Sequence, residues 1–538
     1  MPLQDQPTGI ELDPVDRNET HSAENRPETF RIPGRHFRLT SVEFRDQSDL
    51  TNAYVHERTW LMHANEVVRL SVNLFCVEAP DQNKQWIFVC TAPLPHVWPR
   101  GDDGGVALRL LREGGLHIVC PERVRGGSWI RLETEAGPLA RARTLQDWQR
   151  SQRPQSATHR VPAFLSNTWG DRSKDGRMNE AFILEEIEAA VRLGVDVVQL
   201  DDGWQKGVTS NSVHADRGGV WEGFWNADPA FWTVHPERFP NGLEPVAALA
   251  AQKGVSLGLW FAPDSWNDLV HWERDADTLL DYVRRFGVRH FKLDGIKLHS
   301  ETALERLRSF VRKVHDGSGG RVVFDLDITA ESRPGHFGLI ECGPLFVENR
   351  YTDWISYWPH FTLRNVWQLA RWIDPLRLRF ELLNPDRNPQ NYGGDALAPA
   401  AYRGDALFAS VMCTNPLGWF EVSGLSAERA SEIQGLVSIW KQHREAMTEG
   451  TLLPIGACPD GHNHSGFLIV PRTPEGVWYL LLFRGNTPEE NGAWHLPVDL
   501  PGTWRVLAGQ GEASARGRTL TYSVAQPLGY VFAASGLA

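Results

Sequence analysis

Short runs of alternating apolar and polar residues fill the chain between about residue 30 and residue 145. Runs such as FRLTSVEF, QWIFVCTA and SWIRLETEA have this period of two and are separated by turn residues. Alternation puts every second side chain on one face of a strand, so these runs predict an antiparallel β-sandwich. The same rhythm returns after about residue 448, in runs such as VWYLLLFRG and TLTYSVA, and predicts a second antiparallel β-domain.

Between these regions the pattern changes near residue 160 to continuous apolar runs that alternate with segments of helical spacing. Segments such as 179–194 and 426–447 carry apolar residues at helical spacing, and 179–194 ends in Gly. Eight strands alternating with helices over about 290 residues predict a (β/α)8 barrel. The eight runs are 161–169, 195–200, 255–262, 288–294, 321–327, 344–349, 377–383 and one within 414–422.

A chain of 538 residues is too long for one hydrophobic core, so we expect a multidomain α/β protein. A long stretch rich in Gly, Trp and Asp, 201–240, follows the second barrel strand and is expected to be a functional loop. The expected parts are a flexible N-terminal segment (1–30), an N-terminal antiparallel β-sandwich (31–155), a central (β/α)8 TIM barrel (156–447) and a C-terminal antiparallel β-sandwich (448–538).

Composition and charge narrow the function. The formal net charge of −12 disfavours a nucleic-acid partner, and no apolar run approaches the length of a membrane helix. The N-terminus is polar and acidic, without the apolar core of a secretory signal, so a cytoplasmic location is expected. Six scattered cysteines form no C-x-x-C pair, which favours buried thiols over a zinc ribbon or a redox site.

Carboxylates follow the ends of five consecutive predicted barrel strands. In barrel enzymes the active site lies at these C-terminal ends. A single carboxylate there is often only a helix cap, but five strand ends in a row favour a site. The polar residues at these ends are Asp201 and Asp202 (strand 2), Asp264 (strand 3), Asp294 (strand 4), Asp325 and Asp327 (strand 5), and Glu348 with Asn349 (strand 6), followed by Asp353.

Tryptophans lie close to the same strand ends. The chain has 22 Trp against 9 Tyr, and Trp169, Trp204 and Trp260 fall beside the acidic positions. Carboxylates that accept hydroxyl hydrogen bonds beside indole faces are typical of a sugar pocket. Three further tryptophans lie in the long loop and could form a lid or an added sugar subsite: Trp221, Trp225 and Trp232.

One lysine stands out within this pattern. Only 8 of the 55 cationic residues are Lys, yet Lys292 lies two positions before Asp294, on the same side of the strand. Its ammonium would lower the pKa of Asp294 and keep that carboxylate ionised, as a nucleophile must be. Two of the carboxyls could then cleave a glycosidic bond, one as nucleophile and one as proton donor.

Other chemistries have weaker support. The sequence holds no H-E-x-x-H pair, no Walker-type loop and no G-x-S-x-G elbow. We therefore expect no metal and no cofactor. Substrate and partner are expected to be an oligosaccharide or glycoside, and homo-oligomerisation stays open.

The order SNTWG, LDDGW, GLWFAP, FKLDG and then a strand-6 carboxylate resembles the α-galactosidases of glycoside hydrolase families 36 and 27, and is closer to family 36. The resemblance covers roughly residues 160–460 and implies a retaining double displacement. It implies that Asp294 is the nucleophile and that Lys292 binds sugar hydroxyls. Asp201 and Asp202 match the pair that holds the hydroxyls at C4 and C6, and Trp204 matches the adjoining pocket wall.

The resemblance leaves the acid/base open. The family pattern is Ser-Asp-Asn-Thr-Asp, whereas this chain reads VENRYTD. Strand-end register favours Glu348, and residue type with the Thr-Asp ending favours Asp353. Two departures concern the sugar itself: Arg333 is only a candidate for the family arginine that reads the C2 substituent, and Ala262 stands where the family usually has Glu.

The sequence thus predicts a retaining, exo-acting α-glycoside hydrolase, first of all an α-galactosidase. The alternatives are a related α-glycosidase, a β-L-arabinopyranosidase or a transglycosylase on the same barrel. An alternative of another class is a non-catalytic sugar-binding protein on a barrel scaffold. The expected sugar contacts are Trp169, Asp201, Asp202, Trp204, Trp260, Asp264, Lys292, Asp327, Arg333 and Asn349.

Overall fold

A computed structural model describes residues 28–45, 53–94, 105–120, 123–124, 126–154, 156–328, 334–347 and 351–536. The expected flexible segment 1–30 lies almost entirely outside these residues. Three predicted site residues also lie outside them: Arg333, Glu348 and Asn349.

Eight parallel strands close into a barrel, as the apolar runs predicted. Each strand pairs with its neighbours in sequence, and the last pairs with the first, Leu165 lying opposite Leu417. The strands are short and almost wholly buried, which explains why they are continuous apolar runs rather than alternating ones. They are β11 (Leu165–Asn167), β12 (Val197–Leu200), β13 (Ser256–Phe261), β14 (His290–Leu293), β15 (Val323–Asp327), β16 (Leu345–Val347), β17 (Leu378–Leu382) and β18 (Asn415–Trp419).

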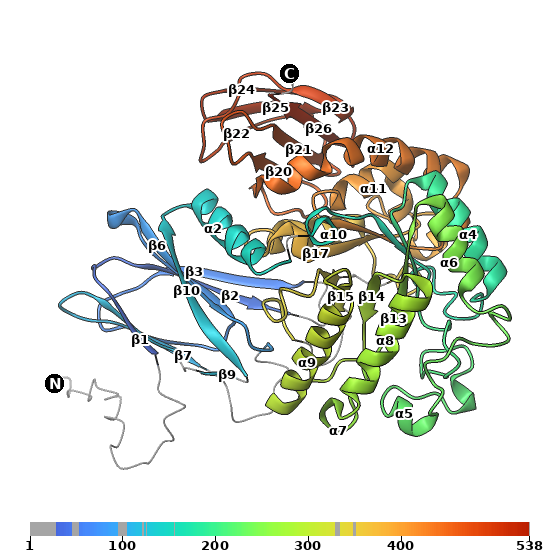
Figure 1. Cartoon of the computed structure of the whole chain (residues 1–538). Coiled ribbons are helices and arrows are strands. Elements are labelled where there is room, and N and C mark those ends of the chain that lie inside the picture. Colours follow the sequence, from blue (N-terminus) through green and yellow to red (C-terminus); the bar gives the residue numbers. More distant parts are fainter. Residues whose placement is uncertain are drawn as a thin grey trace, which may run out of the picture.

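Helices surround this barrel (Figure 1). Three of them end at a glycine in the left-handed conformation, Gly194, Gly254 and Gly287, which is the stop signal seen in the sequence. Three begin at a side-chain cap, Asn179, Ser300 or Ser426. The helices from the barrel onward are α3 (Ala157–Arg160), α4 (Glu180–Leu193), α5 (Phe224–Ala227), α6 (Glu244–Lys253), α7 (Trp266–Leu269), α8 (Trp272–Phe286), α9 (Glu301–Gly317), α10 (Pro359–Leu369), α11 (Gly404–Val411) and α12 (Ala427–Glu449).

Two antiparallel sheets precede the barrel and form the expected N-terminal sandwich. Their facing apolar side chains make a separate core, in which Phe30 of one sheet lies edge-on to Phe88 of the other with ring centroids 5.4 Å apart. One sheet has the order β1 (Glu28–Ile32), β8 (Leu116–Cys120), β7 (Val106–Leu110), β4 (Val67–Leu70). The other has the order β3 (Val55–Leu61), β2 (Arg38–Phe44), β5 (Leu74–Ala79), β6 (Lys84–Cys90), β10 (Gly127–Glu135), β9 (Arg123–Val124).

Two more antiparallel sheets follow the barrel and lie against α11 and α12 in Figure 1. They confirm the C-terminal β-domain. The larger has the order β19 (Thr451–Gly456), β20 (His464–Val470), β21 (Trp478–Arg484), β26 (Tyr530–Ser535), β23 (Arg505–Gly509). The smaller has the order β22 (Asn491–His495), β25 (Thr519–Val524), β24 (Gly511–Arg516).

A helix that alternation could not predict, α2 (Pro138–Ser151), joins the three parts. Gln146 exchanges hydrogen bonds with the backbone of Leu452 in the C-terminal domain, and Arg150 pairs with Asp374 of the barrel at 2.9 Å. The fold class is thus confirmed. The domain boundaries at 31, 156 and 448 stay a prediction.

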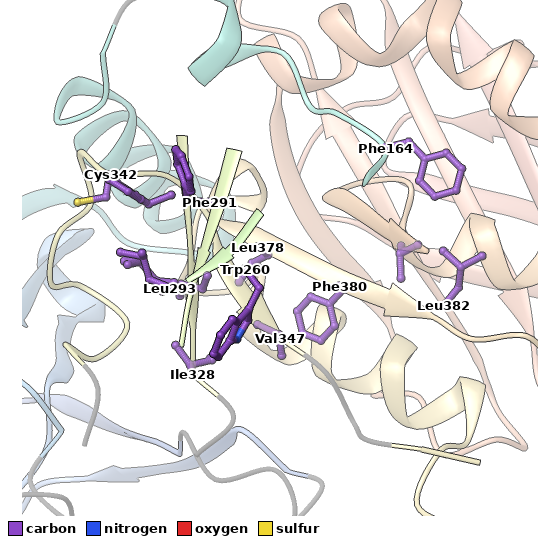
Figure 2. Close-up of a cluster of buried hydrophobic side chains, with 14 of the residues drawn as sticks. Phe164, Trp260, Phe291, Leu293, Ile328, Cys342, Val347, Leu378, Phe380 and Leu382 are labelled. Atoms are coloured by element: carbon purple, nitrogen blue, oxygen red, sulfur yellow. The ribbon is translucent and has the colours of Figure 1, made fainter. Parts of the chain in front are cut away.

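The main core packs the outer faces of the barrel strands against the helices. Figure 2 shows part of this cluster, in which Phe291, Leu293 and Phe380 project from the strands. At the seam between first and last strands, Gly170 approaches Trp419 so closely that a Cβ there would lie 1.9 Å from its carbonyl oxygen. Only glycine permits this closure. Among the described residues, no helix combines the length and apolar character needed to cross a bilayer.

Candidate active site

The ammonium of Lys292 lies among three carboxylates at the C-terminal mouth of the barrel. Its Nζ is 3.3 Å from Asp201 Oδ2, 3.6 Å from Asp327 Oδ2 and 3.8 Å from Asp294 Oδ2. The three acids come from the ends of β12, β15 and β14, so the structure brings together four residues that the sequence predicted. We call this group the Lys292 cluster. One cation among three acids leaves the cluster acidic, which suits a ligand rich in hydroxyl donors.

Two aromatic rings lie beside the Lys292 ammonium on the other side. Its Nζ is 4.7 Å from the centre of the Phe346 ring and 4.9 Å from that of Trp419. The face of an aromatic ring attracts a cation that is shielded from water, so the two rings help to hold the ammonium. Because the rings carry no net charge, they do not change the charge balance between Lys292 and the three acids. Sequence reasoning missed both residues, although each lies in a barrel strand whose end it had already placed at the mouth.

Asp294 differs from the other acids of the Lys292 cluster in its exposure. Its side chain is 15% exposed, whereas those of Lys292, Asp201 and Asp327 are each 4% exposed. Oδ2 of Asp294 accepts a hydrogen bond from Trp260 Nε1 at 3.2 Å, and Oδ1 accepts one from the backbone N–H of Gly295 at 2.7 Å. Asp294 is therefore a fixed carboxylate that a ligand can reach.

The predicted tryptophan platforms have different surroundings. Trp204 is 0% exposed, donates its indole N–H to the carbonyl of Trp260, and packs on Trp232 and Tyr282. Trp204 therefore lies beneath the long loop, and its place in the wall of the sugar pocket stays a prediction.

Trp260 is also buried and offers its indole edge to Asp294 rather than a free face. Trp169 is nearly buried, and its backbone N–H is held by Asn167 Oδ1 at 2.9 Å. Whether either ring touches a sugar stays a prediction.

The loop tryptophans divide in the same way. Trp225 and Trp232 are buried, and the indole N–H of Trp225 donates to Asp275, so their part in a lid or a subsite stays a prediction. Trp221 is only half-buried, and its ring lies 6.0 Å from that of Trp260. A Cβ built on Gly295 would lie 3.6 Å from Trp221 Nε1. Trp221 is thus the loop tryptophan that reaches the neighbourhood of Asp294.

Asp201 and Asp202 follow one another but face different partners. Asp201 Oδ2 accepts from Asn167 Nδ2 at 2.7 Å and faces Lys292. Burial raises the pKa of Asp201, while the Lys292 charge acts in the opposite direction. Asp202 instead accepts from Gln205 Nε2 at 2.6 Å and from Thr209 Oγ1, both in the long loop.

Burial raises the pKa of Asp202 to about 7, although the hydrogen bonds from Thr209 and Gln205 partly counteract it. The structure therefore connects Asp202 with the loop. Its predicted contact with a sugar stays a prediction.

Asp264 has a supporting place in the structure. It is fully buried, and its Oδ1 accepts from the backbone N–H groups of Gly223 at 2.7 Å and Trp266 at 3.3 Å. It fastens the long loop to the segment after β13. Its predicted contact with substrate stays a prediction.

Of the two acid/base candidates, only Asp353 is described. Its Oδ2 accepts from Arg172 Nε at 3.2 Å, and the Arg172 guanidinium lies over the rings of Tyr351 and Trp354 at 4.5 and 4.6 Å. Tyr351 in turn stacks on Trp419 with centroids 6.2 Å apart. Along this series of contacts, Arg172 and the rings of Tyr351 and Trp419 lie between Asp353 and Lys292. Glu348, with Asn349 and Arg333, lies outside the described residues.

Metal-binding chemistry finds no support in this region. Within the described ranges, no group of three or more His, Cys, Asp or Glu side chains is arranged to hold a metal ion. The six cysteines are free thiols; five are buried and Cys458 is half-buried.

Comparison with known proteins gives one consistent relationship. No protein-family model matches the chain. A segment of 127 residues is 32% identical to an α-galactosidase of Pediococcus pentosaceus; it covers 23% of this chain and 15% of that relative.

Among solved structures, an α-galactosidase from Lactobacillus brevis superposes with a TM-score of 0.64 at 11% identity, covering 93% of this chain and 75% of that one. The GH36 α-galactosidase AgaA from Geobacillus stearothermophilus gives a TM-score of 0.61 at 11% identity, with coverage of 92% and 76%. The chain therefore has the fold of GH36 α-galactosidases and is related to them, as the motif order predicted. The sequence match spans less than a sixth of the Pediococcus relative.

Proposed function

We propose that this protein is a retaining, exo-acting α-glycoside hydrolase and that its preferred substrate is a terminal α-galactoside. The observation that carries the proposal is Asp294, an accessible carboxylate fixed by Trp260 and Gly295 beside the Lys292 ammonium. The name of the matched relative and those of the superposed structures support the sugar.

The proposed reaction takes two displacements. An oxygen of Asp294 attacks the anomeric carbon while the bond to the leaving oxygen breaks, and a second carboxyl gives that oxygen its proton. The second carboxyl, now a carboxylate, then takes a proton from water, which attacks the anomeric carbon and releases Asp294. Glu348 and Asp353 are both retained for this second role.

The rest of the Lys292 cluster would bind the sugar. Asp201 and Asp327 can accept hydrogen bonds from hydroxyls, and the ammonium of Lys292 can donate to a hydroxyl oxygen. AgaA variants have been solved with 1-deoxygalactonojirimycin and with raffinose, which supports a galactose-shaped pocket and an oligosaccharide substrate here.

Turnover of a panel of aryl glycosides tests the proposal. We expect the α-galactoside to be cleaved fastest and its first product to keep the α configuration by NMR. Fastest cleavage of another glycoside would change the sugar and keep the mechanism; turnover of none, with 1-deoxygalactonojirimycin still bound, would identify a sugar-binding protein.

The same panel separates the acid/base candidates. Loss of the proton donor slows substrates with poor leaving groups far more than those with good ones. We expect this dependence in one of Glu348→Gln and Asp353→Asn and not in the other.

A further inference from the structure

A chain of buried side chains crosses the barrel interior beneath the Lys292 cluster. Arg379 Nε donates to Asp325 Oδ1 at 2.6 Å, and Gln199 Nε2 lies 3.5 Å from Asp325 Oδ2. Asn167 Nδ2 then donates to Gln199 Oε1 at 2.8 Å and to Asp201 Oδ2 at 2.7 Å. All five residues are at least 97% buried, so water does not compete for these groups.

The direction of every hydrogen bond in this chain follows from its first member. A guanidinium only donates and a carboxylate only accepts, so Arg379 and Asp325 leave no freedom at that end. Asp325 therefore faces the NH2 group of Gln199, and the amide oxygen of Gln199 faces Asn167. Asn167 must then turn its own NH2 toward Gln199 and Asp201.

The far end of the chain lies in the proposed sugar site. With its NH2 committed, Asn167 presents Oδ1 to the backbone N–H of Trp169 at 2.9 Å. Its Nδ2 holds the Asp201 oxygen that also faces Lys292. One amide thus fixes both a carboxylate of the Lys292 cluster and the backbone of the segment that follows β11.

We propose that Arg379 is a positioning residue for sugar binding, acting through Asp325, Gln199 and Asn167 on Asp201 and Trp169. The proposal rests on the proposed function, in which Asp201 accepts from a sugar hydroxyl. A stabilising role alone would not require this arrangement, because apolar side chains can replace a buried ion pair at little or no loss of stability.

Two variants reverse the chain. Arg379→Met leaves Asp325 to take up a proton, after which its O–H can donate to Gln199. Asp325→Asn changes almost no volume; Arg379 still requires an acceptor, so the new NH2 group faces Gln199. In Asp325→Asn, Gln199 must then offer its oxygen to residue 325 and its NH2 to Asn167, and in Arg379→Met the protonated Asp325 permits the same reversal. A reversed Asn167 turns its own NH2 group toward the N–H of Trp169.

The matched control is Arg377→Met. Arg377 is as buried as Arg379 and lies two positions before it, but its guanidinium donates to backbone carbonyls such as those of Gly343 and His336. The same substitution there removes a buried guanidinium without touching the chain. Arg379→Lys, which keeps a charged donor, serves as the conservative rescue.

Two measurements decide the proposal. We expect Arg379→Met and Asp325→Asn to weaken binding of 1-deoxygalactonojirimycin about 10- to 100-fold and to raise KM more than they lower kcat. Hydrogen exchange at the Trp169 amide should accelerate in both. Arg379→Lys should recover most of the binding, and Arg377→Met should leave binding and Trp169 exchange unchanged even if it lowers the unfolding temperature.

The proposal would be overturned if Arg379→Met and Arg377→Met bound the sugar equally well and exchanged the Trp169 amide hydrogen equally fast. It would also be overturned if Asp325→Asn matched the wild type in both sugar binding and Trp169 exchange. If Arg379→Met does not fold, Asp325→Asn alone decides. If the wild type binds no sugar, the proposed function fails. The positioning proposal can still be judged in that case, because exchange of the Trp169 amide in these variants shows whether Arg379 orients Asn167.

Discussion

Asp201 and Asp202 are neighbours in sequence, yet they belong to two different regions of the molecule. Asp201 faces the Lys292 cluster inside the barrel mouth, where its partners are an ammonium and a buried amide. Asp202 faces the base of the long loop, where neutral donors on Gln205 and Thr209 bind it. Successive residues at the end of a strand point in opposite directions, so one dipeptide serves both regions.

The two regions use buried carboxylates differently. In the Lys292 cluster, one cation is shared by three acids and the most exposed of them, Asp294, faces the open side. At the loop base, Asp202 and Asp264 accept hydrogen bonds only from within the protein in the contacts described, and they hold the loop in place. The number of buried carboxylates alone therefore does not distinguish a binding site from the structure that supports it. What distinguishes them is whether the carboxylates face a charged group or neutral hydrogen-bond donors.

The largest effect should follow from Asp294→Ala. We expect turnover of the best aryl glycoside to fall by about four orders of magnitude, because the attacking oxygen is gone. Binding of 1-deoxygalactonojirimycin should remain measurable by calorimetry. A rate within tenfold of the wild type would show that Asp294 is not the nucleophile.

A smaller but broader effect is expected for Lys292→Met, which leaves Asp201, Asp294 and Asp327 without their shared cation. We expect the free energy of unfolding at pH 7 to fall by about 3–5 kcal/mol, because uncompensated buried charge is strongly destabilising.

The loss in Lys292→Met should depend on pH in a defined direction. Burial raises the pKa of Asp201, and the Lys292 charge opposes this. Without the ammonium, folded Asp201 holds its proton more tightly than the unfolded chain does, so stability present at low pH is lost as the pH rises. Urea unfolding at pH 5 and pH 8 measures this. Lys84→Met, at an exposed pair with Glu133, is the control and should change little at either pH. An equal loss at both pH values would count against the shared-cation interpretation.

The smallest effect should come from Asp202→Asn at the loop base. The pKa of Asp202 is raised to about 7, so between about pH 4 and pH 7 the folded state binds a proton that the unfolded state has lost. Wild-type stability should therefore fall across this range by about 3 kcal/mol more than that of Asp202→Asn. Unfolding followed at several pH values would show the flatter profile of the variant; parallel profiles would mean that Asp202 is ionised throughout.

Most of the barrel was predictable because its strands and helices leave local signals. Fully buried parallel strands are continuous apolar runs, and glycines such as Gly194 mark where helices stop. Among the described helices, α11 shows no amphipathic pattern in the sequence, because it is short and almost all of its residues are buried. Helix α2 lies within the range 31–155 that the sequence predicts as the N-terminal β-sandwich, because it follows β10 directly.

The candidate site was predictable as a set of strand ends but not as a set of contacts. Lys292, Asp201, Asp294 and Asp327 come together because parallel strands of a barrel all end at one mouth. Trp204 and Asp264 sit at the same ends and are nevertheless buried, since the long loop 201–240 folds over them. Partners such as Trp419 and Arg379 are fixed only by the closure of the whole barrel, which no local pattern records.

That closure also has a consequence for how the protein forms during synthesis. β11 pairs with β18, whose residues lie roughly 250 positions later in the chain, so the seam at Gly170 and Trp419 is a contact of very high sequence separation. Until residue 419 has left the ribosome, β11 keeps an unpaired edge and the Lys292 ammonium lacks one of its two rings. The proposed sugar pocket can therefore be assembled only late, long after most of its carboxylates have been synthesised.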